Sequence, residues 1–200
     1  MKNLTKSRLF TVILSVLVMF SMLTVFITRP AYAATSKKGM LKEAKKTPAD
    51  KNAKYVVVFS YSAYKVRVYK ITGKDKKGRE EIKCWNASGS KNKEKGYYKI
   101  KNIKTKKRIS KAPKTGKKYY ENFFVCFQGG ERGFHSKVYD HKTDKVWDQT
   151  KTPAKDYGPY QRPKKVFSEN KSEGCVRVEN AGAKWIFNNC SKGDGVSLMS

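Results

Sequence analysis

The sequence is poor in acidic residues and in the residue types that bind metals. Its 200 residues include 16 Asp or Glu against 45 Lys or Arg, so the formal net charge is +29. It has only two histidines and four cysteines, and none of them has the Cys-x-x-Cys or His-rich spacing of a zinc site. Internal repeats, a phosphate-cradling glycine loop and a paired-carboxylate signature are also missing. We therefore expect no metal and no organic cofactor.

The first 33 residues have the composition of an export signal. Lys2, Lys6 and Arg8 precede an uncharged, mostly apolar run over residues 9–27, and Ala31-Tyr32-Ala33 has the form of a cleavage site. The run is also just long enough to span a bilayer, so a cleaved signal peptide and an uncleaved membrane anchor both fit. Either one places the rest of the chain outside the cytoplasm.

The remainder divides into a short linker and one domain. Residues 34–53 are rich in Lys, Ala and Thr and carry no sustained apolar period, which favours a linker. Residues 54–200 have the length of one domain. The lysines are scattered rather than gathered in an aromatic-interleaved patch, which argues against a nucleic-acid partner. For an exported chain the alternatives are anionic wall polymers, membrane lipid or a merely solvating surface.

Strand and turn patterns dominate the domain. We expect a hairpin from two runs of β-branched and alternating residues, a third strand after it, an aromatic core strand and a short last strand. These elements lie at Tyr55–Phe59, Lys65–Tyr69, Glu81–Ala87, Tyr119–Phe127 and Val196–Leu198. A short helix over Ala181–Asn188 follows Asn180, a suitable N-cap.

Two stretches read as loops. The lysine-dense stretch 103–118 is predicted to be a solvated insertion. The stretch 144–171 contains three prolines and is long for a structureless loop, so it is either a lid over a substrate groove or a surface excursion. If it is a lid, Trp147 and Tyr157 are candidates for the groove wall.

The motif that carries chemistry is Ser172-Glu173-Gly174-Cys175-Val176-Arg177. A glycine beside a cysteine leaves the thiol room to be reached, and the nearby arginine favours the thiolate. His135, at the end of the aromatic strand, is the candidate base, with Ser136 beside it to orient the ring. The competing interpretation is that Cys175 is a small buried hydrophobe. The other cysteines, Cys84, Cys126 and Cys190, are expected to be structural thiols.

This motif and the residues that follow it, through Leu198, resemble the C-terminal signature of the L,D-transpeptidase (YkuD-type) catalytic domain. The family has an upstream His, a variable insert and Ser-His-Gly-Cys-(Ile/Val)-Arg. Here Glu173 replaces the second His, and only Gly96 remains of a usual Thr-Pro-x-Gly turn. The resemblance implies a mainly β, sandwich- or barrel-like fold with a few short helices. It also implies Cys175 as nucleophile and His135 as general base. Gly174, Ser136 and Arg177 would bind the oxyanion or orient groups, and Ser172 and Glu173 would line the groove.

The resemblance further implies the substrate. Members of the family cut a peptidoglycan tetrapeptide stem, release D-Ala and pass the acyl group to another stem, which forms a 3-3 cross-link. Water as acceptor would make the protein an L,D-carboxypeptidase. Two alternatives stay open: a sortase-like cysteine transpeptidase, and a catalytically dead cationic wall-binding module.

Overall fold

The computed structural model describes residues 36–111, 116, 118–146, 167, 170 and 172–200. The predicted export signal, Trp147 and Tyr157 lie outside these residues. Within them, no helix is both long enough and apolar enough to cross a membrane.

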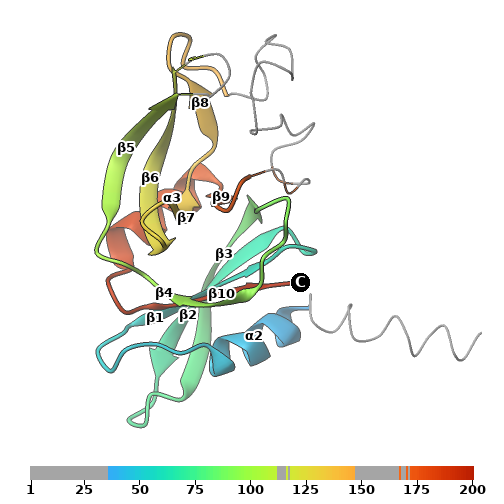
Figure 1. Cartoon of the computed structure of the whole chain (residues 1–200). Coiled ribbons are helices and arrows are strands. Elements are labelled where there is room, and N and C mark those ends of the chain that lie inside the picture. The colour runs from blue at the N-terminus through green and yellow to red at the C-terminus, as the bar shows by residue number, and fades with distance from the viewer. Residues whose placement is uncertain (1–35, 112–115, 117, 147–166, 168–169, 171) are drawn as a thin grey trace, which may run out of the picture.

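The predicted hairpin and its third strand form one half of the fold (Figure 1). Strand β1 (Tyr55–Ser60) pairs antiparallel with β2 (Lys65–Thr72), which pairs antiparallel with β3 (Gly78–Ser88). The last strand, β10 (Gly195–Met199), runs parallel to β1, and β4 (Gly96–Lys99) borders β10. The hairpin, the third strand and the closing strand are thus confirmed.

Strand β3 joins this half to the second one. Its early residues pair with β2, and its last two, Ala87 and Ser88, pair with the next strand of the sheet. The second half contains β9 (Val176–Val178), β7 (Arg132–His135), β6 (Lys118–Gln128), β5 (Lys104–Lys111) and β8 (Val138–Asp140). The strand order is β4-β10-β1-β2-β3-β9-β7-β6-β5, with β8 also on β6. The mainly β prediction is confirmed, as one open sheet.

Helix α3 (Asn180–Asn189) contributes to the main core. Ala183 and Ile186 are fully buried, and Trp185 packs against the core while partly exposed. The helix begins one residue earlier than predicted, since Glu179 occupies the N-cap position without a side-chain bond. Asn180 is instead the first helical residue, and its amide donates to the Tyr139 hydroxyl at 2.6 Å.

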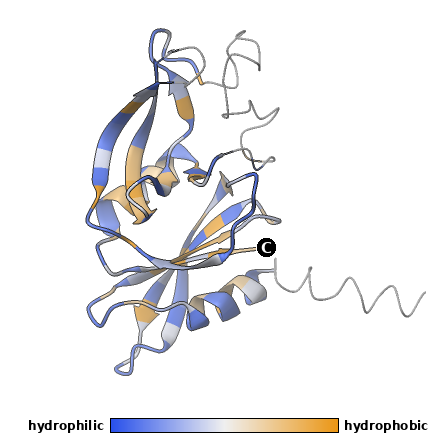
Figure 2. Ribbon diagram, in the orientation of Figure 1, coloured by the Kyte–Doolittle hydropathy of each residue, from blue (hydrophilic) through white to orange (hydrophobic). Residues whose placement is uncertain are grey.

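The linker prediction for residues 34–53 is wrong over α2 (Lys37–Lys46). The Ser36 hydroxyl caps this helix by accepting from the Gly39 N–H at 3.0 Å. Met40 and Ala44, four residues apart, are fully buried against the β1–β2 face, while the rest of the helix is mostly polar (Figure 2). Two apolar positions make too narrow a stripe to stand out in the sequence, yet they cover that face of the sheet.

The prediction of a solvated loop is likewise wrong over β5, which is an edge strand. Lysines suit an edge strand because their charge discourages pairing with another chain. The ammonium of Lys107 lies 3.9 Å from the ring centroid of Tyr120, and the guanidinium of Arg108 lies 4.0 Å from that of Phe124. The basic residues therefore cover aromatic rings of β6 as well as facing water.

Replacing Met40 by Ala tests the docking of α2. We expect Met40→Ala to lower the free energy of unfolding by about 2–4 kcal/mol, because it leaves a cavity between α2 and the sheet. Urea unfolding measures this, with the exposed Lys42→Ala on the same helix as control. Equal stability of the two variants would contradict the packing of α2 on β1 and β2.

Candidate active site

The parallel pairing of β7 with β9 brings His135 and Cys175 together. The register places Phe134 opposite Val176 and His135 opposite Arg177. Side chains alternate between the two faces of a strand, so Cys175, two residues before Arg177, faces the same side as His135. On the other face Phe134 and Val176 are fully buried in the core. Two residues far apart in the sequence therefore share one face of the sheet.

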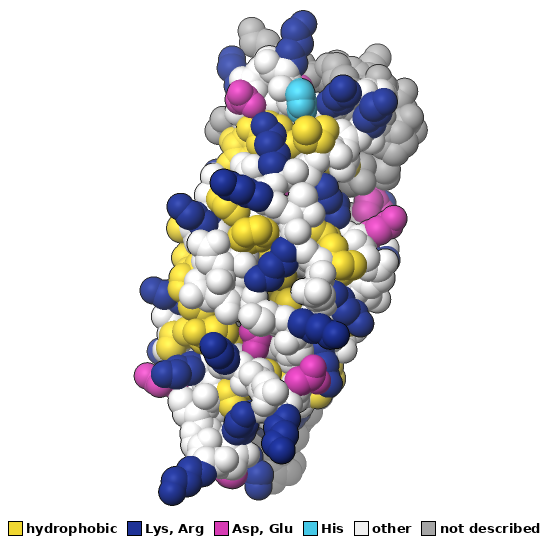
Figure 3. Space-filling model, turned by 90° about the vertical axis from the view of Figure 1, so that its left-hand side faces the viewer, with side chains coloured by type: hydrophobic (Ala, Val, Ile, Leu, Met, Phe, Trp, Pro, Cys, Tyr) yellow, Lys and Arg dark blue, Asp and Glu magenta, His cyan; other side chains and the backbone are white. Residues whose placement is uncertain are grey.

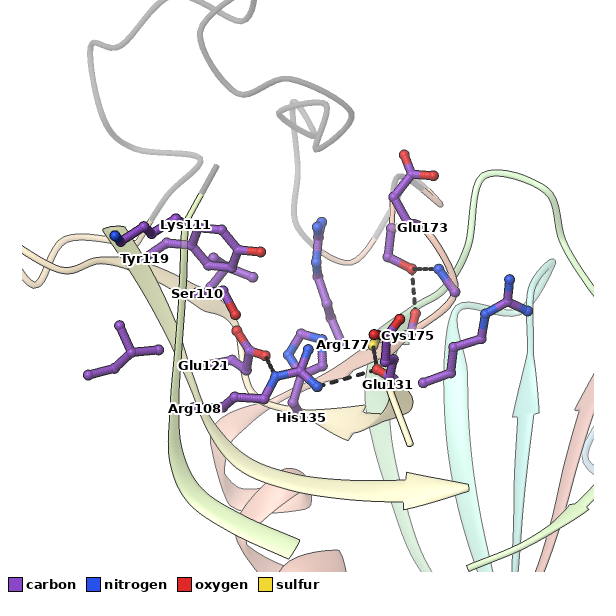
Figure 4. A pocket seen from close by; sticks show the side chains of 15 residues that line it. Arg108, Ser110, Lys111, Tyr119, Glu121, Glu131, His135, Glu173, Cys175 and Arg177 are labelled. Atoms are coloured by element: carbon purple, nitrogen blue, oxygen red, sulfur yellow. Dashed lines mark hydrogen bonds and ion pairs between the residues drawn. The ribbon is translucent and has the colours of Figure 1, made fainter. Parts of the chain in front are cut away.

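A cavity of about 520 Å³ opens on this face (Figure 4). Most of the residues singled out in the sequence line it, namely His135, Ser172, Glu173, Gly174, Cys175 and Arg177. Further lining residues come from the neighbouring strands β5 and β6, among them Arg108, Tyr119 and Glu121. The cavity thus lies where five strands, β5 to β9, and the Cys175 loop converge.

His135 is buried as a neutral ring, with 4% of its surface exposed. Its Nδ1 lies 2.7 Å from the Ser136 carbonyl oxygen, which can only accept, so Nδ1 carries the proton and Nε2 is left as the base. Burial lowers the pKa of His135 to about 3, helped by the charges of Arg177 and Arg108 and opposed by the Ser136 carbonyl. The ring is therefore unprotonated at neutral pH.

Ser136 orients His135 through its backbone rather than its side chain. Its hydroxyl accepts from the Asn122 N–H at 2.9 Å and donates to the Lys137 carbonyl at 2.8 Å. Its own N–H donates to the Asn122 carbonyl at 2.9 Å. The two bonds to Asn122 hold Ser136 against β6, and they therefore fix the carbonyl that bonds to the imidazole.

The Cys175 thiol is partly exposed to the cavity. Its Sγ lies 3.4 Å from the Glu131 carbonyl oxygen. Burial raises the pKa of this thiol; the Gly133 backbone N–H and the Arg108 charge act in the opposite direction. The site therefore holds a neutral thiol and a neutral imidazole.

The loop before Cys175 is tied down by its own hydrogen bonds. The Ser172 hydroxyl donates to the Cys175 carbonyl at 2.5 Å and accepts from the Gly174 N–H at 3.3 Å. A Cβ on Gly174 would lie 2.6 Å from the Arg132 Nε, so no larger residue fits there without displacing that arginine. Glu173 forms an ion pair with Lys91 at 2.8 Å.

The sequence interpretation missed an ion pair in the wall of the cavity, formed by Arg108 and the buried Glu121. Glu121, 2% exposed, accepts from the Arg108 Nε at 2.5 Å, and the two residues face each other across β5 and β6. Burial raises the pKa of Glu121, while Arg108 and Arg177 oppose that shift. Glu121 lies inside the aromatic run 119–127, and this position could have indicated the ion pair. An unpaired carboxylate is costly to bury, so a glutamate in a core strand needs a partner.

The other cysteines remain free thiols. Cys126 and Cys190 are buried, as expected for structural thiols, whereas Cys84 is exposed on β3. In the described part of the chain no cluster of His, Cys, Asp and Glu has the arrangement of a metal site.

The family model of the L,D-transpeptidase catalytic domain (YkuD) matches residues 49–198, about three quarters of the chain. The chain belongs to the L,D-transpeptidase family. No curated protein matches its sequence significantly.

Solved structures share the L,D-transpeptidase fold at low sequence identity. An L,D-transpeptidase from Mycobacterium smegmatis matches with a TM-score of 0.50 and 19% identity, over 74% of this chain and 59% of its own. L,D-transpeptidase 1 from Mycobacterium tuberculosis gives 0.50 and 17%, over 74% and 62%. A fused Zn-dependent amidase/peptidase/peptidoglycan-binding domain-containing protein from Clostridium acetobutylicum gives 0.50 and 14%, over 80% and 57%. The chain thus spans less than two thirds of each of these structures.

The buried neutral His135 makes stability depend on pH. Below about pH 6.5 the unfolded chain binds a proton at this histidine and the folded chain does not, so stability falls as the pH falls. Relative to His135→Gln, we expect the wild type to lose about 1.4 kcal/mol of unfolding free energy per pH unit between pH 6 and 4.

Urea unfolding at several pH values measures this difference. The exposed His141→Gln serves as control and should follow the wild type. If the wild type and His135→Gln lose stability in parallel, the histidine is not buried as a neutral ring.

Proposed function

We propose that this chain is an exported L,D-transpeptidase that forms 3-3 cross-links in peptidoglycan through a cysteine acyl-enzyme. The observation that carries the proposal is the pairing in one cavity of the Cys175 thiol with a histidine whose Nε2 is held unprotonated. Membership of the family supports the class of reaction and points to stem peptides as substrates.

In the first step, His135 Nε2 takes the Cys175 proton and the sulfur attacks the carbonyl carbon of a tetrapeptide stem. The C–N bond to D-Ala breaks, His135 returns the proton to the leaving amine, and a thioester remains. The Gly174 N–H already donates to Ser172, so we assign the oxyanion to the Cys175 N–H. In the second step an amine of another stem attacks the thioester carbonyl and gives a proton to His135 Nε2, the C–S bond breaks as the amide forms, and His135 returns that proton to the sulfur.

Glu173, which stands in place of a family histidine, is compatible with this mechanism. Its carboxylate forms its ion pair with Lys91, so the base assigned here is His135 and not the residue at position 173. Both members of the Cys175–His135 pair are present, which favours an enzyme over a catalytically dead wall-binding module. Water as acceptor, giving an L,D-carboxypeptidase, and a sortase-like reaction are the remaining alternatives.

Mass spectrometry of muropeptides tests the reaction. Incubation of disaccharide-tetrapeptides with the protein should yield 3-3 cross-linked dimers and free D-Ala. Cys175→Ala should lower the rate by at least about a thousandfold, because no other group can form the thioester. Cys84→Ser, which removes an exposed thiol on β3, should retain full activity.

The products separate the alternatives. Tripeptides without dimers would identify a carboxypeptidase, and cleavage of a sorting-motif peptide alone would identify a sortase. Imipenem, bound in a solved L,D-transpeptidase structure at 16% identity, serves as an acylating probe. If Cys175 takes up no imipenem and no muropeptide changes, the enzyme proposal fails.

We also propose that the protein acts outside the cytoplasm and is held in the wall by its charge. The support is the export-type composition of residues 1–33, with membrane association through residues 9–27 if they stay uncleaved, and the basic surface. Figure 3 shows Lys and Arg side chains spread over the whole visible face. Such a distribution suits anionic wall polymers, which present charge over a large area.

Sedimentation with purified sacculi tests retention by charge. Binding should be strong at low salt, fall several-fold as NaCl rises above about 0.3 M, and weaken on sacculi stripped of anionic polymers, because screening removes exposed-charge attraction. Binding that is indifferent to both treatments would contradict electrostatic retention.

A further inference from the structure

Arg108 is held rigidly at the back of the catalytic cavity. Its Nε donates to Glu121, its Nη1 lies 3.3 Å from the Glu131 carbonyl oxygen, and its guanidinium lies 4.0 Å from the ring centroid of Phe124. Three fixed contacts on a residue that lines the cavity leave the guanidinium little freedom. A side chain that only covered the surface of an edge strand would not need them.

The Glu131 carbonyl links Arg108 to the nucleophile. This one oxygen accepts from the Arg108 Nη1 and also from the Cys175 Sγ at 3.4 Å. The guanidinium and the sulfur therefore both bond to one acceptor (Figure 4). When the thiol gives up its proton, the sulfur loses its bond to the carbonyl, and the Arg108 cation held on the same oxygen is close enough to act on the new charge.

The other titratable and charged groups that line the cavity come from strands β5, β6, β7 and β9 and from the loops before β7 and β9. They are Lys111, Tyr119, Glu121, Glu131, Arg132, His135, Glu173 and Arg177.

Several of these groups are engaged elsewhere. Arg132 forms an ion pair with Glu94, Glu173 pairs with Lys91, and His135 is neutral. Arg108 and Arg177 are the cations whose charges act on the Cys175 thiol, Arg108 although it is itself paired with Glu121. Of the two, Arg108 has the larger effect in lowering the pKa of Cys175, and Glu121 works against it.

We propose that Arg108, positioned by Glu121, stabilises the Cys175 thiolate and so sets the reactivity of the nucleophile. The inference rests on the proposed role of Cys175 as nucleophile. It assigns to β5, a strand whose sequence reads as a lysine-rich surface, the cation that offsets the burial of the thiol. In the proton transfer the S–H bond breaks, an N–H bond forms at His135 Nε2, and the new negative charge on sulfur faces Arg108.

The test is the pH dependence of iodoacetamide alkylation of Cys175 in the full chain, followed on its peptide by mass spectrometry. The alkylation measurement does not depend on any activity toward peptidoglycan. We expect Arg108→Gln to move the alkylation midpoint of Cys175 upward by about one pH unit. Arg108→Lys, which keeps the charge, should stay closer to the wild type.

Lys107→Gln is the matched control. It removes the same charge from the adjacent position of β5, where the side chain lies over Tyr120 rather than in the cavity. Its alkylation midpoint should equal that of the wild type. If Arg108→Gln and Lys107→Gln give the same midpoint, the proposed role of Arg108 is wrong.

Glu121→Gln provides a second test in case Arg108→Gln, which leaves a buried carboxylate unpaired, fails to fold. An amide at position 121 can still accept from Arg108 but no longer opposes its charge. The midpoint should therefore move downward, and an unchanged or raised midpoint would overturn the inference. Shifted midpoints without muropeptide products would leave the role of Arg108 intact and refute the transpeptidase instead.

Discussion

The site depends on a very short parallel ladder, the two residue pairs that join β7 to β9. A shift of one residue in its register would turn His135 or Cys175 to the opposite face, where Phe134 and Val176 fill the core. The register is fixed by the packing of Phe134 and Val176 in that core. It is also fixed by Ser136, whose N–H and hydroxyl both form hydrogen bonds with β6. Packing on one face thus decides the chemistry available on the other.

Burial sets the protonation state of the pair. Burial disfavours both the imidazolium and the thiolate, so the site holds a neutral ring and a neutral thiol. In the cavity wall Arg108 opposes this effect of burial on the thiol, while its partner Glu121 adds to it.

The departures from the family motif involve neither His135 nor Cys175. Glu173 forms its ion pair with Lys91, and the turn that keeps only Gly96 of its usual motif leads into β4, at the far end of the sheet from β5. Neither change touches the hydrogen bond that fixes the His135 ring.

Much of the fold could be read from local pattern. Alternation in Lys65–Tyr69, the apolar run Tyr55–Phe59 and the aromatic run Tyr119–Phe127 identified strands because a half-buried strand imposes a period of two. The pattern failed for α2, which has two buried side chains, and for β5, in which five of the eight residues are basic. In both cases the neighbouring strands supply the apolar surface, so the segment itself carries little signal.

The sequence by itself determined the reactive types: a cysteine after a glycine, an upstream histidine and an arginine, in an order that resembles one family. Only the tertiary structure decided which atoms meet. The tautomer of His135 follows from a backbone carbonyl, and Arg108, which shares the cavity with Cys175, comes from a strand far from the motif. Such contacts depend on strand register and burial. Both are set by how distant segments pack together, so neither segment's sequence predicts them alone.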